Sequence, residues 1–219
     1  MRKVPAGLWI LTFGIVGFLI SWLFSDLITL DRNSVVLAYL FVGGAALIGF
    51  FRSAPGRFRE HLRQSWPAGF LVGLALGALL SVTVVAQPSS PVPSGRDLAW
   101  ALVWLGLVYG LLDAFLLNIA PVVAVTASDH RSGRLCRRLR QGSLALAASA
   151  FVTAAYHLGY SEFRGPQLRQ PLIGNAILTA GYIVSGSMVA PLIGHVIMHG
   201  ASVLHGMETT TQLPPHYPP

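Results

Sequence analysis

Residues 66–86 read WPAGFLVGLALGALLSVTVVA, a stretch without one charged side chain. A helix of about 20 apolar residues crosses the ~30 Å hydrocarbon core of a bilayer. Six further apolar stretches share this character: 6–25, 34–51, 98–127, 142–160, 171–187 and 189–206. Backbone groups in lipid must bond within their own segment, so these runs predict helices, and the alternation of a membrane β-barrel is absent. We expect an all-α, polytopic transmembrane helix bundle of about seven spans.

The overall composition supports a membrane location. The chain has 219 residues, of which 53% are hydrophobic and 11% are charged. Soluble domains carry roughly 25% charged residues, so this chain cannot cover a large water-facing surface. The 15 Lys and Arg against 8 Asp and Glu lie in the gaps between apolar runs, which is typical of topology signals and does not indicate nucleic-acid binding. The single cysteine, Cys136, excludes an internal disulfide and a Cys-rich metal site.

The basic residues also predict an orientation in the membrane. Eleven of the fifteen lie near the N-terminus or in the gaps 52–65 and 128–141, which fall on one side of a seven-span bundle. Cytoplasmic loops are enriched in Lys and Arg. We therefore expect a cytoplasmic N-terminus and an external loop at 87–97.

Three regions follow from the order of the apolar runs. Residues 1–97 form an N-terminal three-helix transmembrane region, and residues 98–208 form a four-helix transmembrane core. Residues 209–219 are rich in proline and predict a disordered tail.

Small residues recur at four-residue spacing in the third span, at Gly69, Gly73 and Gly77. Glycines at this spacing lie on one helix face and let a second helix approach closely. The stripe predicts packing within the chain, with a homodimer interface as the alternative.

Few ionisable side chains lie inside the spans: Asp113, His157, His195 and His199, with Asn118 as a neutral companion. Such residues are costly in hydrocarbon and indicate a functional site. His195 and His199 are four residues apart and share a helix face, whereas Asp113 and Asn118 lie about 140° apart on an α-helix. We expect Asp113 and the three histidines to converge on one cavity.

The C-terminal half carries three recognisable motifs. Residues 186–195 read GSMVAPLIGH and are similar to a Gly-Ser-apolar-Trp-x-Pro lead into His-x-x-x-Asn, with His199 in the place of Asn. Residues 154–159, AAYHLG, match a Phe-x-x-x-His motif at the histidine. Residues 113–118, DAFLLN, align with Glu-Glu-x-x-x-Arg and keep the acid only at Asp113. In this order the motifs resemble the CPBP family of intramembrane proteases, which includes the CAAX prenyl endopeptidases and the bacterial Abi proteins.

This resemblance covers about residues 105–206 and implies a metal-independent endopeptidase acting on a peptide or prenylated peptide at the bilayer. It implies that Asp113 and His157 activate water, while His195 and His199 face the oxyanion. Asn118 stands where the family has Arg. The departures at Ala114, Asn118 and His199 also fit an inactive relative.

Two other functions fit the same side chains. Asp113, His157, His195 and His199 resemble the ligands of a catalytic zinc site, which has protein ligands and an open position for water. The cluster could instead tie helices together in a scaffold or binding protein. Elemental analysis for zinc separates the metal-dependent hydrolase from the others.

Overall fold

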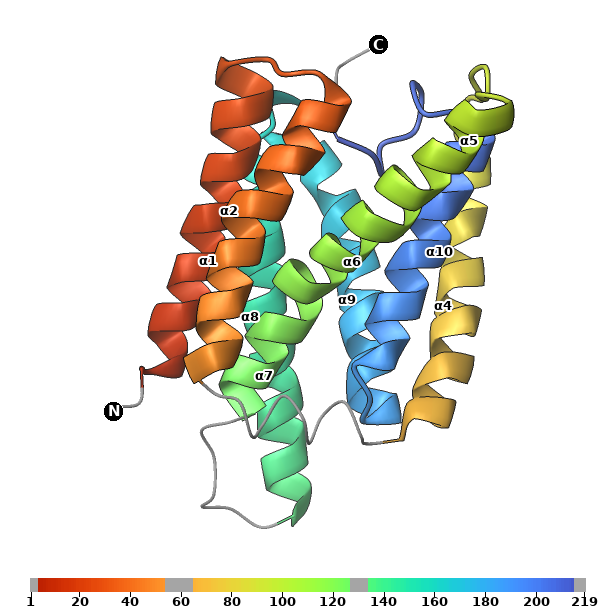
Figure 1. Ribbon diagram of the computed structural model, residues 1–219. Coiled ribbons are helices and arrows are strands. Elements are labelled where there is room, and N and C mark those ends of the chain that lie inside the picture. Colours follow the sequence, from red (N-terminus) through yellow and green to blue (C-terminus); the bar gives the residue numbers. More distant parts are fainter. Residues whose placement is uncertain (1–3, 54–64, 127–133, 215–219) are drawn as a thin grey trace.

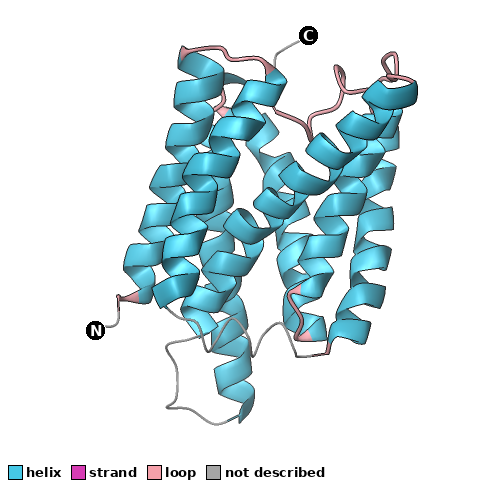
Figure 2. Ribbon diagram, viewed as in Figure 1, coloured by secondary structure: helices cyan, strands magenta, loops and turns pink. Residues whose placement is uncertain are grey.

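The computed structural model describes residues 4–53, 65–126 and 134–214, without the side chains of 134–139. Within these ranges the chain forms a bundle of seven helical rods and contains no strand (Figures 1 and 2). The first three rods are α1 (Ala6–Ile20) continued by η1 (Ser21–Leu27), α2 (Arg32–Ser53) and α4 (Trp66–Val85). The fourth joins α5 (Gly95–Ala101), η2 (Leu102–Tyr109), α6 (Gly110–Asp113), η3 (Ala114–Ile119) and α7 (Ala120–Thr126). The last three are α8 (Arg134–Leu158), α9 (Arg169–Ser185) and α10 (Val189–His205), with short turns η4 (Ser161–Phe163) and η5 (Pro166–Leu168) before α9.

Four of these rods are long and apolar enough to cross a membrane, namely Ala6–Leu27, Arg32–Ser53, Trp66–Val85 and Gly95–Thr126. The rod α10 is a shorter apolar helix. The expected all-α transmembrane bundle is therefore confirmed. The fifth rod begins at Arg134, earlier than the apolar run at 142, because arginine is a good helix former and only the apolar part was visible as a span.

The glycine stripe of α4 packs against α10 of the same chain. A Cβ atom on Gly73 would lie 2.7 Å from Cβ of Ile193, and one on Gly77 would lie 2.7 Å from Cβ of Ile197. Any larger residue would push the helices apart. The expected packing within the chain is confirmed, and α10 covers the face that the homodimer alternative would need.

The two transmembrane regions expected from the sequence, 1–97 and 98–208, are interleaved in one bundle. The N-terminal helix α1 packs along α8, and α4 packs along α10 and α9. The fourth rod crosses the bundle diagonally between these groups (Figure 1). The segments α6 and η3 of this rod therefore lie in the interior, between the two groups of helices.

A tight hairpin joins α9 to α10. Gly186 ends α9 with φ of +65°, a left-handed conformation that costs glycine little, and its N–H donates to the Tyr182 carbonyl at 2.8 Å. Ser187 Oγ then accepts the N–H of Val189 at 3.3 Å. The hairpin separates the last two apolar runs into two helices that lie side by side.

Residues 206–214, here called the C-terminal strap, pack across one end of the bundle. Arg32 Nε donates to the Pro214 carbonyl at 2.8 Å, and the Leu213 side chain is only 1% exposed. The expected disorder of 209–219 is therefore wrong as far as Pro214. Its composition is typical of a flexible tail, but one buried leucine and an arginine from α2 hold it in place.

Candidate functional site

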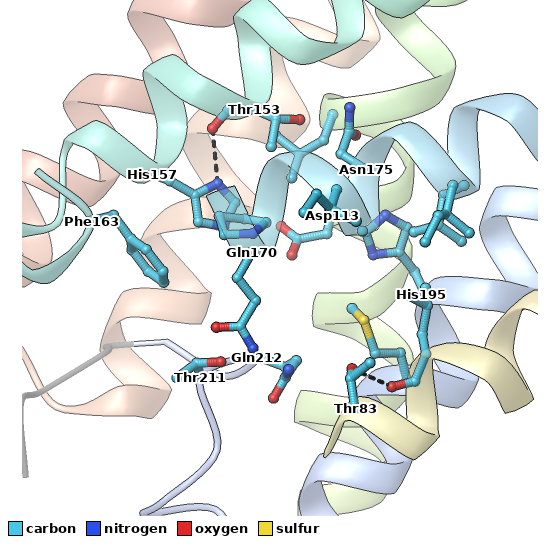
Figure 3. A pocket seen from close by; sticks show the side chains of 18 of the residues that line it. Thr83, Asp113, Thr153, His157, Phe163, Gln170, Asn175, His195, Thr211 and Gln212 are labelled. Carbon is cyan, nitrogen blue, oxygen red and sulfur yellow. Dashed lines mark hydrogen bonds between the residues drawn. The ribbon is translucent and has the colours of Figure 1, made fainter. Parts of the chain in front are cut away.

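All four ionisable side chains of the spans line one cavity of about 630 Å³. Asp113 enters it from α6, His157 from α8, and His195 and His199 from α10. Figure 3 shows Asp113, His157 and His195 around this cavity. Each of the four is at least nine-tenths buried. The expected convergence on one cavity is confirmed, and the volume is within the range of small-molecule sites.

Asp113 lies closest to His199 among the histidines. His199 Nε2 is 3.3 Å from Asp113 Oδ2, within ion-pair distance, but the direction is outside hydrogen-bond geometry. Asp113 Oδ1 has no hydrogen-bond partner either. The His199 ring packs edge-on against Tyr109, with centroids 4.8 Å apart. The site therefore holds a carboxylate whose buried oxygens are only partly compensated.

His195 is oriented by Asn118. Its Nε2 lies 2.7 Å from Asn118 Oδ1, and the Asn118 amide is itself fixed, because Nδ2 donates to Asn175 Oδ1 and Thr179 Oγ1, both at 2.8 Å. An amide oxygen only accepts, so Nε2 of His195 carries the hydrogen. In the neutral ring the lone pair is then on Nδ1, which is buried and has no hydrogen-bond partner.

A polar network between three rods holds Asn118 in this orientation. Asn175 Nδ2 donates to Ser149 Oγ at 2.9 Å, and Ser149 donates to the Leu117 carbonyl at 2.5 Å. Thr179 and Ser149 join their hydroxyls at 2.9 Å. Each donor in this hydrogen-bond network has an acceptor. The donor and acceptor roles are therefore fixed throughout the network, and they set the tautomer of His195.

His157 is fixed as the opposite tautomer. Its Nδ1 lies 2.8 Å from the Thr153 carbonyl, which only accepts, so Nδ1–H donates and the neutral ring has its lone pair on Nε2. Tyr156 and Phe163 pack edge-on against the ring, with centroids 5.1 and 5.0 Å away. His157 is thus a positioned proton acceptor on the cavity wall.

A chain of buried tyrosines adjoins the site. The hydroxyls of Tyr109 and Tyr156 are 2.9 Å apart, and those of Tyr156 and Tyr160 are 2.8 Å apart. Tyr109 contacts the His199 ring and Tyr156 contacts the His157 ring. These hydrogen-bonded tyrosines thus link the surroundings of His199 and His157.

Sequence reasoning missed these neutral polar residues, although a spacing signal was present. Polar residues recur every four positions within apolar spans: Tyr109 and Asp113; Ser149, Thr153 and His157; Asn175 and Thr179; His195 and His199. Positions four apart share a helix face, so each set marks the face that its helix turns toward the interior.

The pairs differ from those that the CPBP resemblance implies. Asp113 lies against His199, and His195 is bonded to Asn118. Neutral His195 offers a lone pair on Nδ1, whereas an oxyanion needs an N–H donor. Protonation of His195 is therefore required for the oxyanion role.

Three of the four residues also form a candidate metal centre. Asp113, His195 and His199 each offer one ligand atom, and these atoms all lie within 4.8 Å of one another. His157 lines the same cavity but is outside this group.

Comparisons with protein-family models, with curated proteins and with solved structures found no match to this chain.

Proposed function

We propose that this chain is an intramembrane hydrolase that cleaves peptide bonds, a CPBP-like endopeptidase. The observation that supports this proposal best is the convergence of Asp113, His157, His195 and His199 from three rods on one cavity. A device that only ties helices together needs paired polar groups, whereas Asp113 Oδ1 and His195 Nδ1 are buried without hydrogen-bond partners.

The proposed reaction is the addition of water to a peptide carbonyl. His157 Nε2 takes a proton from water, and the water oxygen forms a bond to the carbonyl carbon. The carbon–nitrogen bond then breaks, and the proton passes from His157 to the departing amine. The negative charge of Asp113 stabilises His157 while His157 carries the proton.

The lining of the cavity favours an amphipathic peptide. The lining includes the apolar residues Leu80, Ile177 and Leu178 and the polar residues Gln170 and Gln212. Figure 3 shows Gln170 and Gln212 on the side of the cavity away from Asn175. A peptide with an apolar or prenylated side chain fits a lining that is partly apolar and partly polar. This composition supports a peptide or a prenylated peptide as the substrate.

Orientation follows from charge, and we propose a cytoplasmic N-terminus. Much of the two Arg-rich gaps, at 54–64 and 127–133, lies outside the described residues, so this proposal depends on the positive-inside rule. The C-terminal strap and the 87–94 loop are hydrogen-bonded at the opposite end of the bundle. Gln212 of the strap lines the cavity, so substrate would enter from the external side.

The test is hydrolysis by the full chain in proteoliposomes, with fluorogenic peptides that are unmodified or farnesylated. We expect cleavage by the wild type and by His205→Ala, a control on α10 whose Nε2 bonds the Gln87 carbonyl. Asp113→Asn and His157→Ala should lose cleavage while they keep the wild-type thermal unfolding profile. Equal cleavage by all four proteins would overturn the proposal, as would none by the wild type.

A further inference from the structure

Three features of the site together point to a bound cation: the spacing of its ligand atoms, the tautomer of His195, and the buried atoms without partners. We infer that Asp113, His195 and His199 form a binding site for a divalent transition metal of the zinc class. The inference deepens the proposed function, because the cation would hold the hydrolytic water, and it departs from the metal-independent chemistry that the resemblance implies.

The spacing between Asp113 and His199 matches that of two ligands on one metal. Ligand atoms bound to zinc at 2.0–2.1 Å with a tetrahedral angle lie about 3.3 Å apart. Asp113 Oδ2 and His199 Nε2 are separated by 3.3 Å without hydrogen-bond geometry. The separations that involve His195 are at most 4.8 Å, so His195 must approach by up to about 1.5 Å to complete the set.

The environment of His195 is that of a metal ligand. Histidine ligands commonly donate their second ring N–H to a carbonyl or carboxylate, which fixes the ring and leaves the other nitrogen for the metal. Asn118 Oδ1 is this acceptor, at 2.7 Å from His195 Nε2. The network behind Asn118 prevents its amide from turning, so Nδ1 of His195 has its lone pair ready for a cation.

A cation would also satisfy one ring nitrogen of each histidine among the buried atoms that the described residues leave without partners. Asp113 Oδ1, His195 Nδ1 and both ring nitrogens of His199 have no hydrogen-bond partner. A buried carboxylate without full compensation is costly, and a divalent charge removes that cost. Imidazole ligands favour zinc-like metals over magnesium and calcium, which prefer oxygen ligands.

The number of ligands suits catalysis. Catalytic zinc sites have three protein ligands and one open position for water, whereas structural sites have four. Here the three ligand residues line the cavity, so the open position faces the substrate space. His157 lines the same cavity outside the set, which keeps it for proton transfer.

The test uses zinc and cobalt(II) with the purified full chain in detergent, after tag removal and chelator treatment. Elemental analysis should give about one zinc per wild-type chain. Cobalt should give the visible absorption of a four- or five-coordinate site. The control His205→Ala should behave like the wild type. Asp113→Asn, His195→Gln and His199→Ala should each weaken zinc binding by more than about 100-fold.

Zinc should raise the thermal unfolding temperature of the wild type, and it should leave that of the three ligand variants unchanged. This measurement reports zinc binding by any variant that folds. Zinc that binds all variants equally would show adventitious ions and overturn the inference. Cleavage by metal-free protein would overturn it too and leave the proposed function standing. Zinc binding without cleavage of any peptide would support the site and overturn the function.

Discussion

The Nε2 atom of His195 lies 2.7 Å from Oδ1 of Asn118, and this contact fixes the tautomer of the buried histidine. In the proposed alignment with the CPBP motif, Asn118 takes the place of an arginine, which offers only donors. The asparagine offers an acceptor to His195 and donors to Asn175 and Thr179. Asn118 thus selects the tautomer of His195 without adding a charge.

Removal of this acceptor should destabilise the protein. Asn118→Leu leaves the His195 Nε2–H and the acceptors on α9 buried without their partner, which costs about 1–3 kcal/mol. Thermal unfolding in detergent measures the effect. The control Thr83→Val changes a cavity residue outside this network and should unfold close to the wild type. Identical unfolding of the two variants would show that the network adds no stability.

His199→Asn separates the two chemistries of the site. The substitution restores the residue that the CPBP motif has, and it keeps an N–H donor for an oxyanion. An amide is, however, a much poorer metal ligand than imidazole. We expect zinc affinity and cleavage to fall together, measured by titration and by peptide hydrolysis. Full cleavage by His199→Asn would favour the metal-independent mechanism.

Asp113→Glu tests how closely the carboxylate is placed. The longer side chain restores the acid of the family motif but moves the oxygens by one methylene, away from the 3.3 Å spacing to His199. We expect weaker zinc binding than in the wild type and stronger binding than in Asp113→Asn, since a carboxylate remains. A zinc titration of the three proteins checks this order, and reversal would contradict it.

The glycine stripe should be intolerant of large residues. Gly77→Leu places a side chain where a Cβ atom alone would lie 2.7 Å from Ile197 Cβ, so overpacking should destabilise the chain by about 1–3 kcal/mol. Gly44 of α2 has open space at its Cβ position, and Gly44→Leu is the matched control. The thermal unfolding temperatures of both variants measure the effect, and Gly77→Leu should unfold at the lower temperature. An undisturbed Gly77→Leu would mean that α4 and α10 are farther apart than described.

Orientation can be tested with single cysteines in a Cys136→Ser background. A membrane-impermeant maleimide should label position 94 in intact cells, because the 87–97 loop is expected to be external. Position 57 lies in an Arg-rich gap and should be labelled only after permeabilisation. Labelling of position 57 in intact cells would reverse the proposed topology.

The C-terminal strap should depend on its one anchoring leucine. Leu213 is 1% exposed, and Leu213→Ala removes most of its buried apolar surface. We expect faster proteolysis of the strap, measured by mass spectrometry, with the bundle intact. Leu204→Ala is the control, because Leu204 is 56% exposed on α10. Equal proteolysis of the two variants would show that Leu213 does not hold the strap.

The sequence alone determined the architecture and the ionisable members of the site. Apolar runs long enough for a bilayer define the helices, because backbone groups in lipid have no alternative partners. Asp113 and the three histidines stand out for a related reason, since polar side chains are rare in such runs.

Tertiary structure decided which partners these side chains have. On an α-helix Asp113 and Asn118 would point about 140° apart. The turn of η3 between them is wider, with the Ala120 N–H bonded to the carbonyl five residues back, so that both side chains reach α10. A single sequence does not specify this local widening, since it depends on how the rod packs across its neighbours. The tautomers of His157 and His195 depend in turn on acceptors from Thr153 and Asn118, whose directions only the packed helices fix.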